Sequence, residues 1–169
     1  MASWIPGDDF ATFLGPGVGN VDQLELSMVA DAACSAVDEA CGPQASTHVT
    51  GELVEPSNGY LTTRWPVAGG LTATTIAGGE VDVSGWRRAN GPLGHYADNV
   101  GCRPLLVSYT TGSVKPPEWA VAAAKIIGRH LWATRLGPNR NSSMQQGAGY
   151  LIPNQAEALL APHRLPART

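Results

Sequence analysis

The spacing of apolar residues changes twice along this chain of 169 residues. Between residues 21 and 41, apolar and small residues recur three or four positions apart, which is typical of one face of an α-helix. From 46 to 111 the spacing becomes a loose alternation rich in β-branched residues, as in strands, and at 117–136 the helical spacing returns. The sequence therefore predicts an α+β fold, a small helical bundle with an antiparallel β-hairpin or sheet insert.

Shorter elements are predicted from their boundary residues. A short helix is expected at 8–14, where two aspartates precede an apolar stretch and a Gly-Pro pair follows it. Another is expected at 155–160, between two prolines. The predicted organisation is an N-terminal arm with a short helix (1–20), a core of two helices and the β region (21–137), and a flexible loop with a C-terminal segment (138–169).

Turn-forming residues predict how the strands of the β region pair. Thr47–Glu55 and Tyr60–Val67 are separated by Pro-Ser-Asn-Gly, which indicates a hairpin. Leu71–Ala77 and Glu80–Ser84 flank two glycines and form a second predicted hairpin. The clearest single strand is 104–111. We expect four to six antiparallel strands.

The sequence offers no recognisable catalytic or metal-binding motif. No serine lies in a GxSxG motif, and the four histidines lie on different predicted elements without HxxxH or HExxH spacing. The three cysteines lack CxxC spacing. Cys34 and Cys41 are separated by about 10.5 Å along one helix, too far for a disulfide, and are expected to be buried as small apolar residues. We expect no catalytic residue, metal or cofactor.

Three residues have more than one interpretation. His130 falls on the apolar stripe of the second long helix, where it could be a metal ligand or a packed core histidine, and the packed core histidine is expected. Trp132 lies off the centre of that stripe and could face a partner. Trp4, with Ile5, belongs to the N-terminal arm, where the pair could enter a partner's groove or pack back on its own domain.

Charge is distributed unevenly although the net charge is only −3. Residues 1–100 carry −9 and residues 101–169 carry +6. This split fits a contact between molecules or a surface that faces a polyanion, and it equally fits two halves that neutralise each other within the fold.

Neither a membrane anchor nor a secretory signal is expected. The longest apolar runs fall far short of the ~18 residues of a membrane span, and the N-terminus has no basic region followed by an apolar one. An odd number of cysteines without paired spacing fits a reducing compartment, so synthesis in a cytoplasm is expected.

Four segments together suggest a family. In the second half they are PPEWAVAAAKIIGRHLWATRLGP (116–138) and GAGYLIPNQAEALLAPHRLP (147–166). In the first they are LSMVADAACSAVDEACG (26–42) and the strand PLLVSYTTG (104–112). Their order resembles that of the head-to-tail adaptor proteins of tailed bacteriophages, also called head-tail connector proteins, over about residues 9–166.

This resemblance implies a structural protein of the virion neck, assembled in the host cytoplasm, and not an enzyme. Members form a ring, commonly of twelve copies, beneath the portal protein. The ring extends the channel for genomic DNA, without sequence-specific binding, and presents a surface to the next neck or tail component. The C-terminal segment of the family docks against the portal, and the matching positions here are Tyr150, Leu151, Ile152, Pro153, Leu159, Leu160, His163 and Arg164.

The uneven charge suggests how copies could meet in such a ring. An acidic surface on one copy could pair with a basic surface on the next, a head-to-tail contact that closes on itself. We predict that contacts between copies or with the portal involve Arg129, Arg135, Arg140, Asp31, Asp38 and Glu39.

Other functions remain open at this stage. A neck stopper or a tail terminator would also be a virion protein, but those are typically β-rich, and two long helices favour the adaptor. A small non-viral cytoplasmic binding module or an enzyme is a different class, which a cluster of histidines and acids in a pocket would support.

Overall fold

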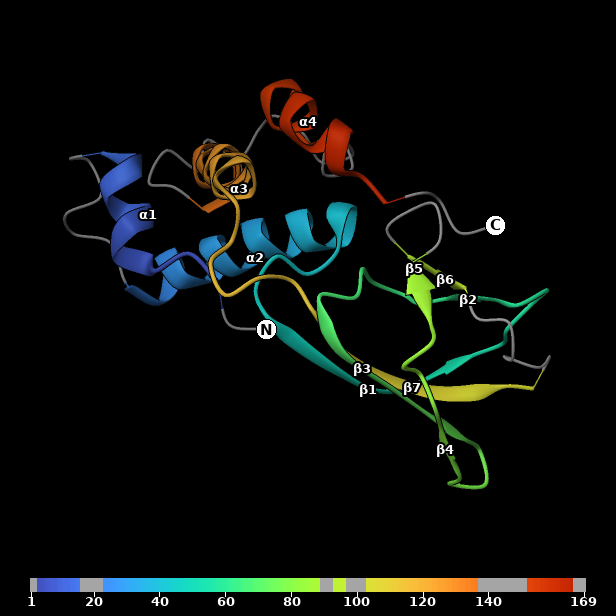
Figure 1. Ribbon diagram of the computed structural model, residues 1–169. Coiled ribbons are helices and arrows are strands. Elements are labelled where there is room, and N and C mark those ends of the chain that lie inside the picture. The colour runs from blue at the N-terminus through green and yellow to red at the C-terminus, as the bar shows by residue number, and fades with distance from the viewer. Residues whose placement is uncertain (1–2, 16–22, 89–92, 97–102, 137–151, 166–169) are drawn as a thin grey trace. The chain divides into compact units, whose positions relative to one another are not determined.

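The computed structural model divides into two compact units (Figure 1). The helical unit joins residues 1–44 to residues 116–169, and the sheet unit comprises residues 45–115. Each has its own hydrophobic core. The fold is therefore α+β, as the change in apolar spacing predicts. The structure describes residues 3–15, 23–88, 93–96, 103–136 and 152–165.

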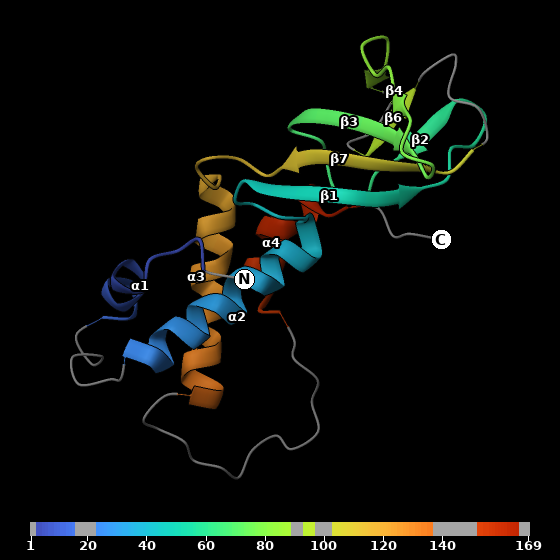
Figure 2. The same cartoon turned by 90° about the horizontal axis from the view of Figure 1, so that it is seen from below.

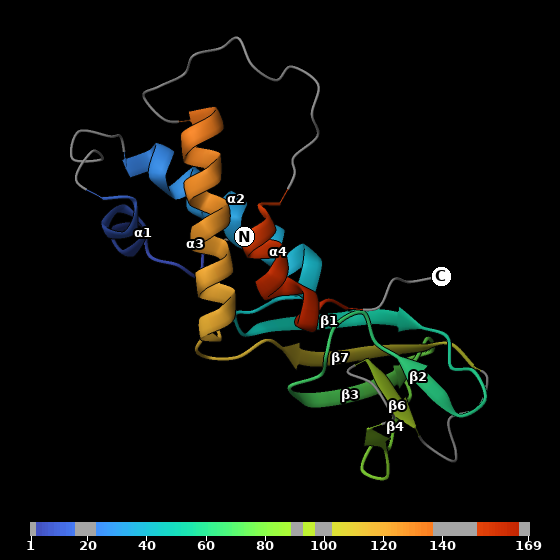
Figure 3. The same ribbon diagram turned by 90° about the horizontal axis from the view of Figure 1, so that it is seen from above.

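The helical unit contains the helices that the sequence predicts. α3 begins after two prolines, and the Pro117 carbonyl accepts hydrogen bonds from the amides of Ala120 and Val121. α3 and α4 lie over the same side of α2 (Figures 1 and 3). In the described part of the chain the elements are α1 (Gly7–Leu14), α2 (Gln23–Cys41), α3 (Glu118–Leu131), the π-helical turn η2 (Trp132–Leu136), α4 (Asn154–Leu160) and the 3₁₀ turn η3 (Ala161–His163).

Small side chains make up much of the core of the helical unit. Short side chains let helix axes approach closely, so α2, α3 and α4 pack through them. Gly128 lets α1 approach α3 closely. A Cβ atom at this position would collide with the ring of the fully buried Phe10. The buried alanines are Ala30, Ala33, Ala120, Ala123, Ala124 and Ala156.

This use of small residues overturns the expectation for His130. The buried face of α3 is formed by alanines with Ile127 and Leu131, and His130 is exposed. The prediction gave weight to the larger residues of α3, whereas alanines occupy the contact with α2. Trp132 packs partly against this core, and of the two alternatives for Trp4 and Ile5 the structure shows packing on the chain's own core.

The sheet unit consists of two antiparallel sheets. The larger has the strand order β1-β7-β3-β4 and the smaller β2-β6-β5. The described strands are β1 (Thr47–Val54), β2 (Tyr60–Thr62), β3 (Gly69–Thr75), β4 (Glu80–Val81), β5 (Arg87–Arg88), β6 (Gly94–Tyr96) and β7 (Leu105–Thr111).

The two sheets share one core, and β7 is its central strand. β7 alternates strictly between buried and half-buried residues, so Val107 and Tyr109 are fully covered. Leu61 of β2 is also fully buried and belongs to the same cluster. The predicted strand at 104–111 therefore organises the whole unit.

One of the two predicted hairpins is wrong. β3 and β4 pair across Gly78 and Gly79 as expected. At Pro56–Gly59 the turn also forms, with Ser57 and Tyr60 exchanging two backbone hydrogen bonds of 2.8 Å. However, β1 pairs with β7, and β2 pairs with β6. A tight turn determines only the first residue pair, and the longer pairing follows from burial of the alternating face of β7.

Candidate functional site

The C-terminal segment, where portal contacts are predicted, packs on the core of its own helical unit. Ala156 and Leu160 lie one turn apart on α4 and both are fully buried. Pro153 immediately precedes α4, and its carbonyl accepts a hydrogen bond from the Glu157 amide. The inward face of α4 is thus occupied within the chain.

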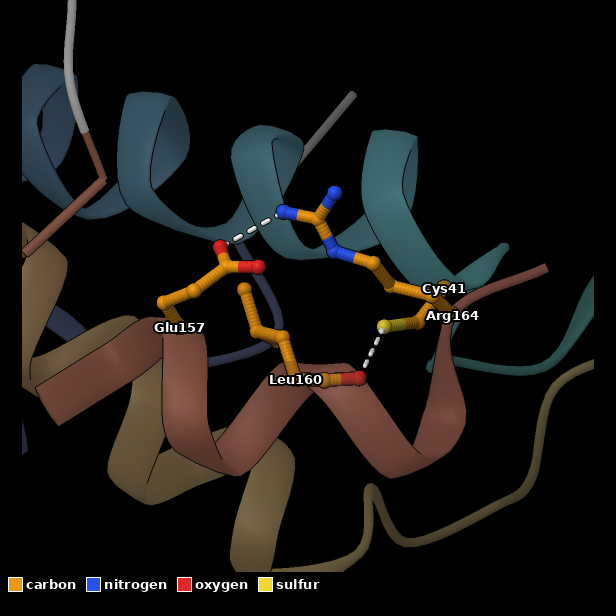
Figure 4. A network of polar contacts seen from close by, with 4 residues as sticks. All are labelled: Cys41, Glu157, Leu160 and Arg164. Atoms are coloured by element: carbon orange, nitrogen blue, oxygen red, sulfur yellow. Dashed lines mark hydrogen bonds and ion pairs between the residues drawn. The ribbon is translucent and has the colours of Figure 1, made fainter. Parts of the chain in front are cut away.

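Polar contacts hold the end of this segment (Figure 4). An Arg164 guanidinium nitrogen donates to Glu157 Oε2 at 2.6 Å, and the Cys41 thiol donates to the Leu160 carbonyl at 3.7 Å. Beyond η3, the Leu165 amide donates to the Ala40 carbonyl at 3.3 Å. The first contact is internal to the C-terminal segment, and the other two join that segment to the C-terminal end of α2.

An aromatic stack adds a contact with α3. The rings of His163 and Trp119 lie 3.9 Å apart between centroids and 9° from parallel. The two residues are 44 positions apart in the sequence, so no local pattern could have revealed this pair. η3 is thereby fixed over the first turn of α3.

The residues predicted to contact the portal differ in exposure. Leu160 is fully buried against the chain's own core, so it cannot touch another protein while α4 holds this position. Ile152, Pro153 and Leu159 are half-buried, and His163 and Arg164 are exposed. Tyr150 and Leu151 lie outside the described residues. Contact of this segment with the portal stays a prediction.

The charged residues predicted for contacts between copies do not belong to a single element. Arg129 on α3 and Glu39 on α2 are exposed, and Asp31 on α2 is half-buried. For Arg135 only the backbone in η2 is described, and Arg140 lies outside the described residues.

Asp38 serves a contact that the sequence did not reveal. Its Oδ1 accepts the Gln44 amide at 2.8 Å and its Oδ2 accepts Trp4 Nε1 at 3.3 Å. Burial raises the pKa of Asp38, and the two hydrogen bonds oppose that shift. Both carboxylate oxygens are therefore engaged within the unit, where they hold the N-terminal arm against α2.

The cysteines of α2 are buried and free, as the helical spacing predicts. Burial raises the pKa of both Cys34 and Cys41. Because the thiolate is the nucleophilic form, this environment disfavours reactivity. Cys102 lies outside the described residues.

The sheet unit has its own polar cluster beside its core. Tyr109 donates its hydroxyl proton to Glu52 Oε2 at 2.5 Å and accepts the Trp65 amide at 3.1 Å. Glu52 Oε1 accepts the Arg64 amide at 2.6 Å. The guanidinium of Arg64 lies 5.1 Å from the centroid of the Trp65 ring. The cluster ties β1 and β7 to the segment that follows β2.

His95 on β6 is buried, and its Nε2 atom has no hydrogen-bond partner among the described residues. Burial lowers the pKa of His95, and the nearby Arg88 lowers it further. A neutral imidazole is therefore favoured inside this sheet.

Within the described ranges, no group of three or more histidine, cysteine, aspartate or glutamate side chains is arranged to hold a metal ion. No described helix combines the length and apolar character needed to cross a membrane.

Comparisons with known proteins identify the fold. No protein-family model matches the sequence. No curated protein matches it either.

Solved structures do match, over nearly the whole chain. A chain of the virion of a native gene transfer agent (GTA) particle is 18% identical, with a TM-score of 0.64 over 100% of this chain and 95% of that one. A chain from the neck of an empty GTA particle, computed with C6 symmetry, is 19% identical, with a TM-score of 0.65 over 98% of this chain and 91% of that one. A chain from the neck of a native GTA particle, computed with C12 symmetry, is 17% identical, with a TM-score of 0.54 over 99% and 94% of the two chains. The chain shares its α+β fold, in both units, with these proteins.

Proposed function

We propose that this chain is a structural virion protein, a head-to-tail adaptor that assembles as a ring beneath the portal, extends the DNA channel and connects the capsid to the tail. The observation that carries the proposal is the fold likeness to neck chains, which covers 98% or more of this chain. A likeness of that extent includes the β insert as well as the helices. The resemblance of the sequence to head-to-tail adaptors supports the same function independently.

A ring is supported by the symmetry of the similar assemblies. The neck structures that contain the similar chains were computed with C6 and C12 symmetry. Twelve copies around the channel are compatible with both. The role proposed is mechanical and not catalytic, and it places the protein in the neck of the virion.

Within this proposal, the exposed side of the C-terminal segment contacts the portal. The predicted residues available for it within the described ranges are the exposed His163 and Arg164 and the half-buried Ile152, Pro153 and Leu159. Leu160 is not among them, because its side chain is fully buried in the core of the helical unit. DNA passes the ring without base recognition, so any contact with phosphates is weak and depends on salt.

The test is assembly on the portal protein encoded in the same genome. The purified chain and portal are mixed and viewed by negative-stain electron microscopy, and we expect rings seated on portal particles. The charge reversal Arg129→Glu, Arg135→Glu, Arg140→Glu should abolish them. The matched control reverses the same number of charges in the sheet unit, with Arg87→Glu, Arg103→Glu and Lys115→Glu, and should retain them. Wild-type protein that never binds the portal would refute the proposal, and normal assembly by the triple-reversal variant would refute the role of those arginines.

A further inference from the structure

One face of α2 points away from the core and combines apolar with acidic residues. Leu24 and Met28, one turn apart, are 64% and 56% exposed. Further along the same face come the half-buried Asp31 and the exposed Glu39. Helical spacing places these side chains on one stripe about 22 Å long. We name it the acidic stripe, which comprises Leu24, Met28, Asp31, Ala32, Ser35 and Glu39.

The outward face of α3 has the opposite charge. Ala122, Lys125 and Arg129 lie three or four positions apart, on the side opposite the buried residues of α3. The ammonium of Lys125 lies 5.7 Å from the centroid of the Phe13 ring, and Arg129 is exposed. We name these three residues the basic stripe. The small Ala122 leaves room beside the two cations for larger apolar side chains.

The two stripes lie on opposite sides of one unit. α2 and α3 pack against each other through their buried faces, so their outward faces point apart. Seen from below, α2 lies in front of α3 (Figure 2), and seen from above, α3 lies in front of α2 (Figure 3). A twelvefold ring turns each copy by only about 30° relative to the next, so it needs contact surfaces on nearly opposite sides of the subunit.

We infer that the acidic stripe of one copy docks on the basic stripe of the next copy and that this contact closes the ring, an inference that rests on the proposed function. The occupant is a second copy of this chain because each stripe supplies what the other lacks. Asp31, Glu39 and Arg129 form no ion pair with any other residue that the structure describes. The exposed Leu24 and Met28 supply the apolar area that a stable contact needs, with charges at its margin.

A charge exchange tests the pairing directly. Asp31→Lys with Glu39→Lys makes both stripes basic, whereas Lys125→Glu with Arg129→Glu makes both acidic. Each double variant alone should lower the yield of rings on the portal about tenfold or more, because like charges then meet. All four substitutions in one chain should restore rings, since complementarity returns with reversed sign. Circular dichroism and thermal melting confirm that each variant is folded.

Mixing the two defective proteins gives a second readout. An equal mixture should form rings in which the variants alternate, with half the rotational symmetry of the wild-type ring. A stripe that binds only the portal would allow neither rescue. A contact between two identical stripes would be restored in the mixture but not in the four-substitution chain, so that chain distinguishes it from the proposed contact. Failure of both the four-substitution chain and the mixture would overturn the inference.

Cross-linking tests the contact without the portal. Met28→Cys and Ala122→Cys in one chain should give a ladder of disulfide-linked multimers when concentrated protein is oxidised. Met28→Cys with Gln155→Cys, which places the second thiol on exposed α4, should not, and the wild type controls for the native cysteines. A ladder without portal binding would support this contact and count against the adaptor function. Rings on the portal without a ladder or a charge rescue would leave the adaptor function standing and overturn the proposed contact.

Discussion

The hydrophobic cores of the two units differ in composition. The helical unit fills its core with alanines and one essential glycine, and large residues such as Phe10 fit into the spaces that these leave. The sheet unit has fewer buried apolar residues and includes buried polar atoms, among them His95 Nε2 and Thr111 Oγ1, which lack partners among the described residues. The helical unit is thus expected to be sensitive to added volume, and the sheet unit to changes in hydrogen bonding and protonation.

The largest expected effect comes from adding one methyl group to the helical unit. Gly128→Ala should lower the free energy of unfolding by about 3 kcal/mol, because the new Cβ collides with the Phe10 ring and overpacking outweighs the better helix propensity of alanine. Thermal and urea unfolding measure it. The control is Gly7→Ala on α1, where the nearest side-chain atom is 3.8 Å from the added carbon and no loss is expected. Equal stability of the two variants would contradict the close packing of α1 on α3.

A smaller effect is expected from removing one hydroxyl of the sheet unit. Tyr109→Phe keeps the ring but leaves the Trp65 amide and Glu52 Oε2 without this partner, which should cost about 1–2 kcal/mol. Urea unfolding gives the value. The control Thr72→Val removes an exposed hydroxyl with a long hydrogen bond of 3.4 Å and should change stability by about 0.5 kcal/mol or less. If Tyr109→Phe proves as neutral as the control, the polar cluster does not support the sheet.

The smallest effect is expected from His95. It concerns how the free energy of unfolding changes with pH and not the stability at neutral pH. Because burial lowers its pKa, the unfolded chain binds the proton more readily than the folded one, so stability should decrease as pH falls below about 6.5 and continue to fall until the folded pKa is passed. His95→Phe should flatten this part of the pH profile. His48→Asn, which removes an exposed histidine, is the matched control. An unchanged slope in His95→Phe would assign the pH dependence to other groups.

Predictability from the sequence follows the same division between the units. The helices were predicted because α2 and α3 are defined by spacing within a few residues and by prolines and glycines at their ends. The pairing of β1 with β7 is not predictable in this way, because the partners lie 51 to 64 residues apart and compete with a well-formed local turn at Pro56–Gly59.

In the candidate site, too, contacts between residues far apart in the sequence could not be predicted. The resemblance pointed to the C-terminal segment, but nothing local shows that Leu160 faces inward, that His163 stacks on Trp119, or that Asp38 holds Trp4. Each of these depends on contacts across more than thirty positions of the chain. The exposure of Arg129 and Glu39, by contrast, follows from the helical spacing alone.

A cryo-electron microscopy reconstruction of the neck of the particle that carries this protein tests the adaptor function directly. We expect a closed ring of this chain immediately below the portal, with α4 and η3 nearest the portal and α2 of each copy against α3 of the next. A ring found instead at the far end of the neck or on the tail, with another protein between it and the portal, would contradict the adaptor function.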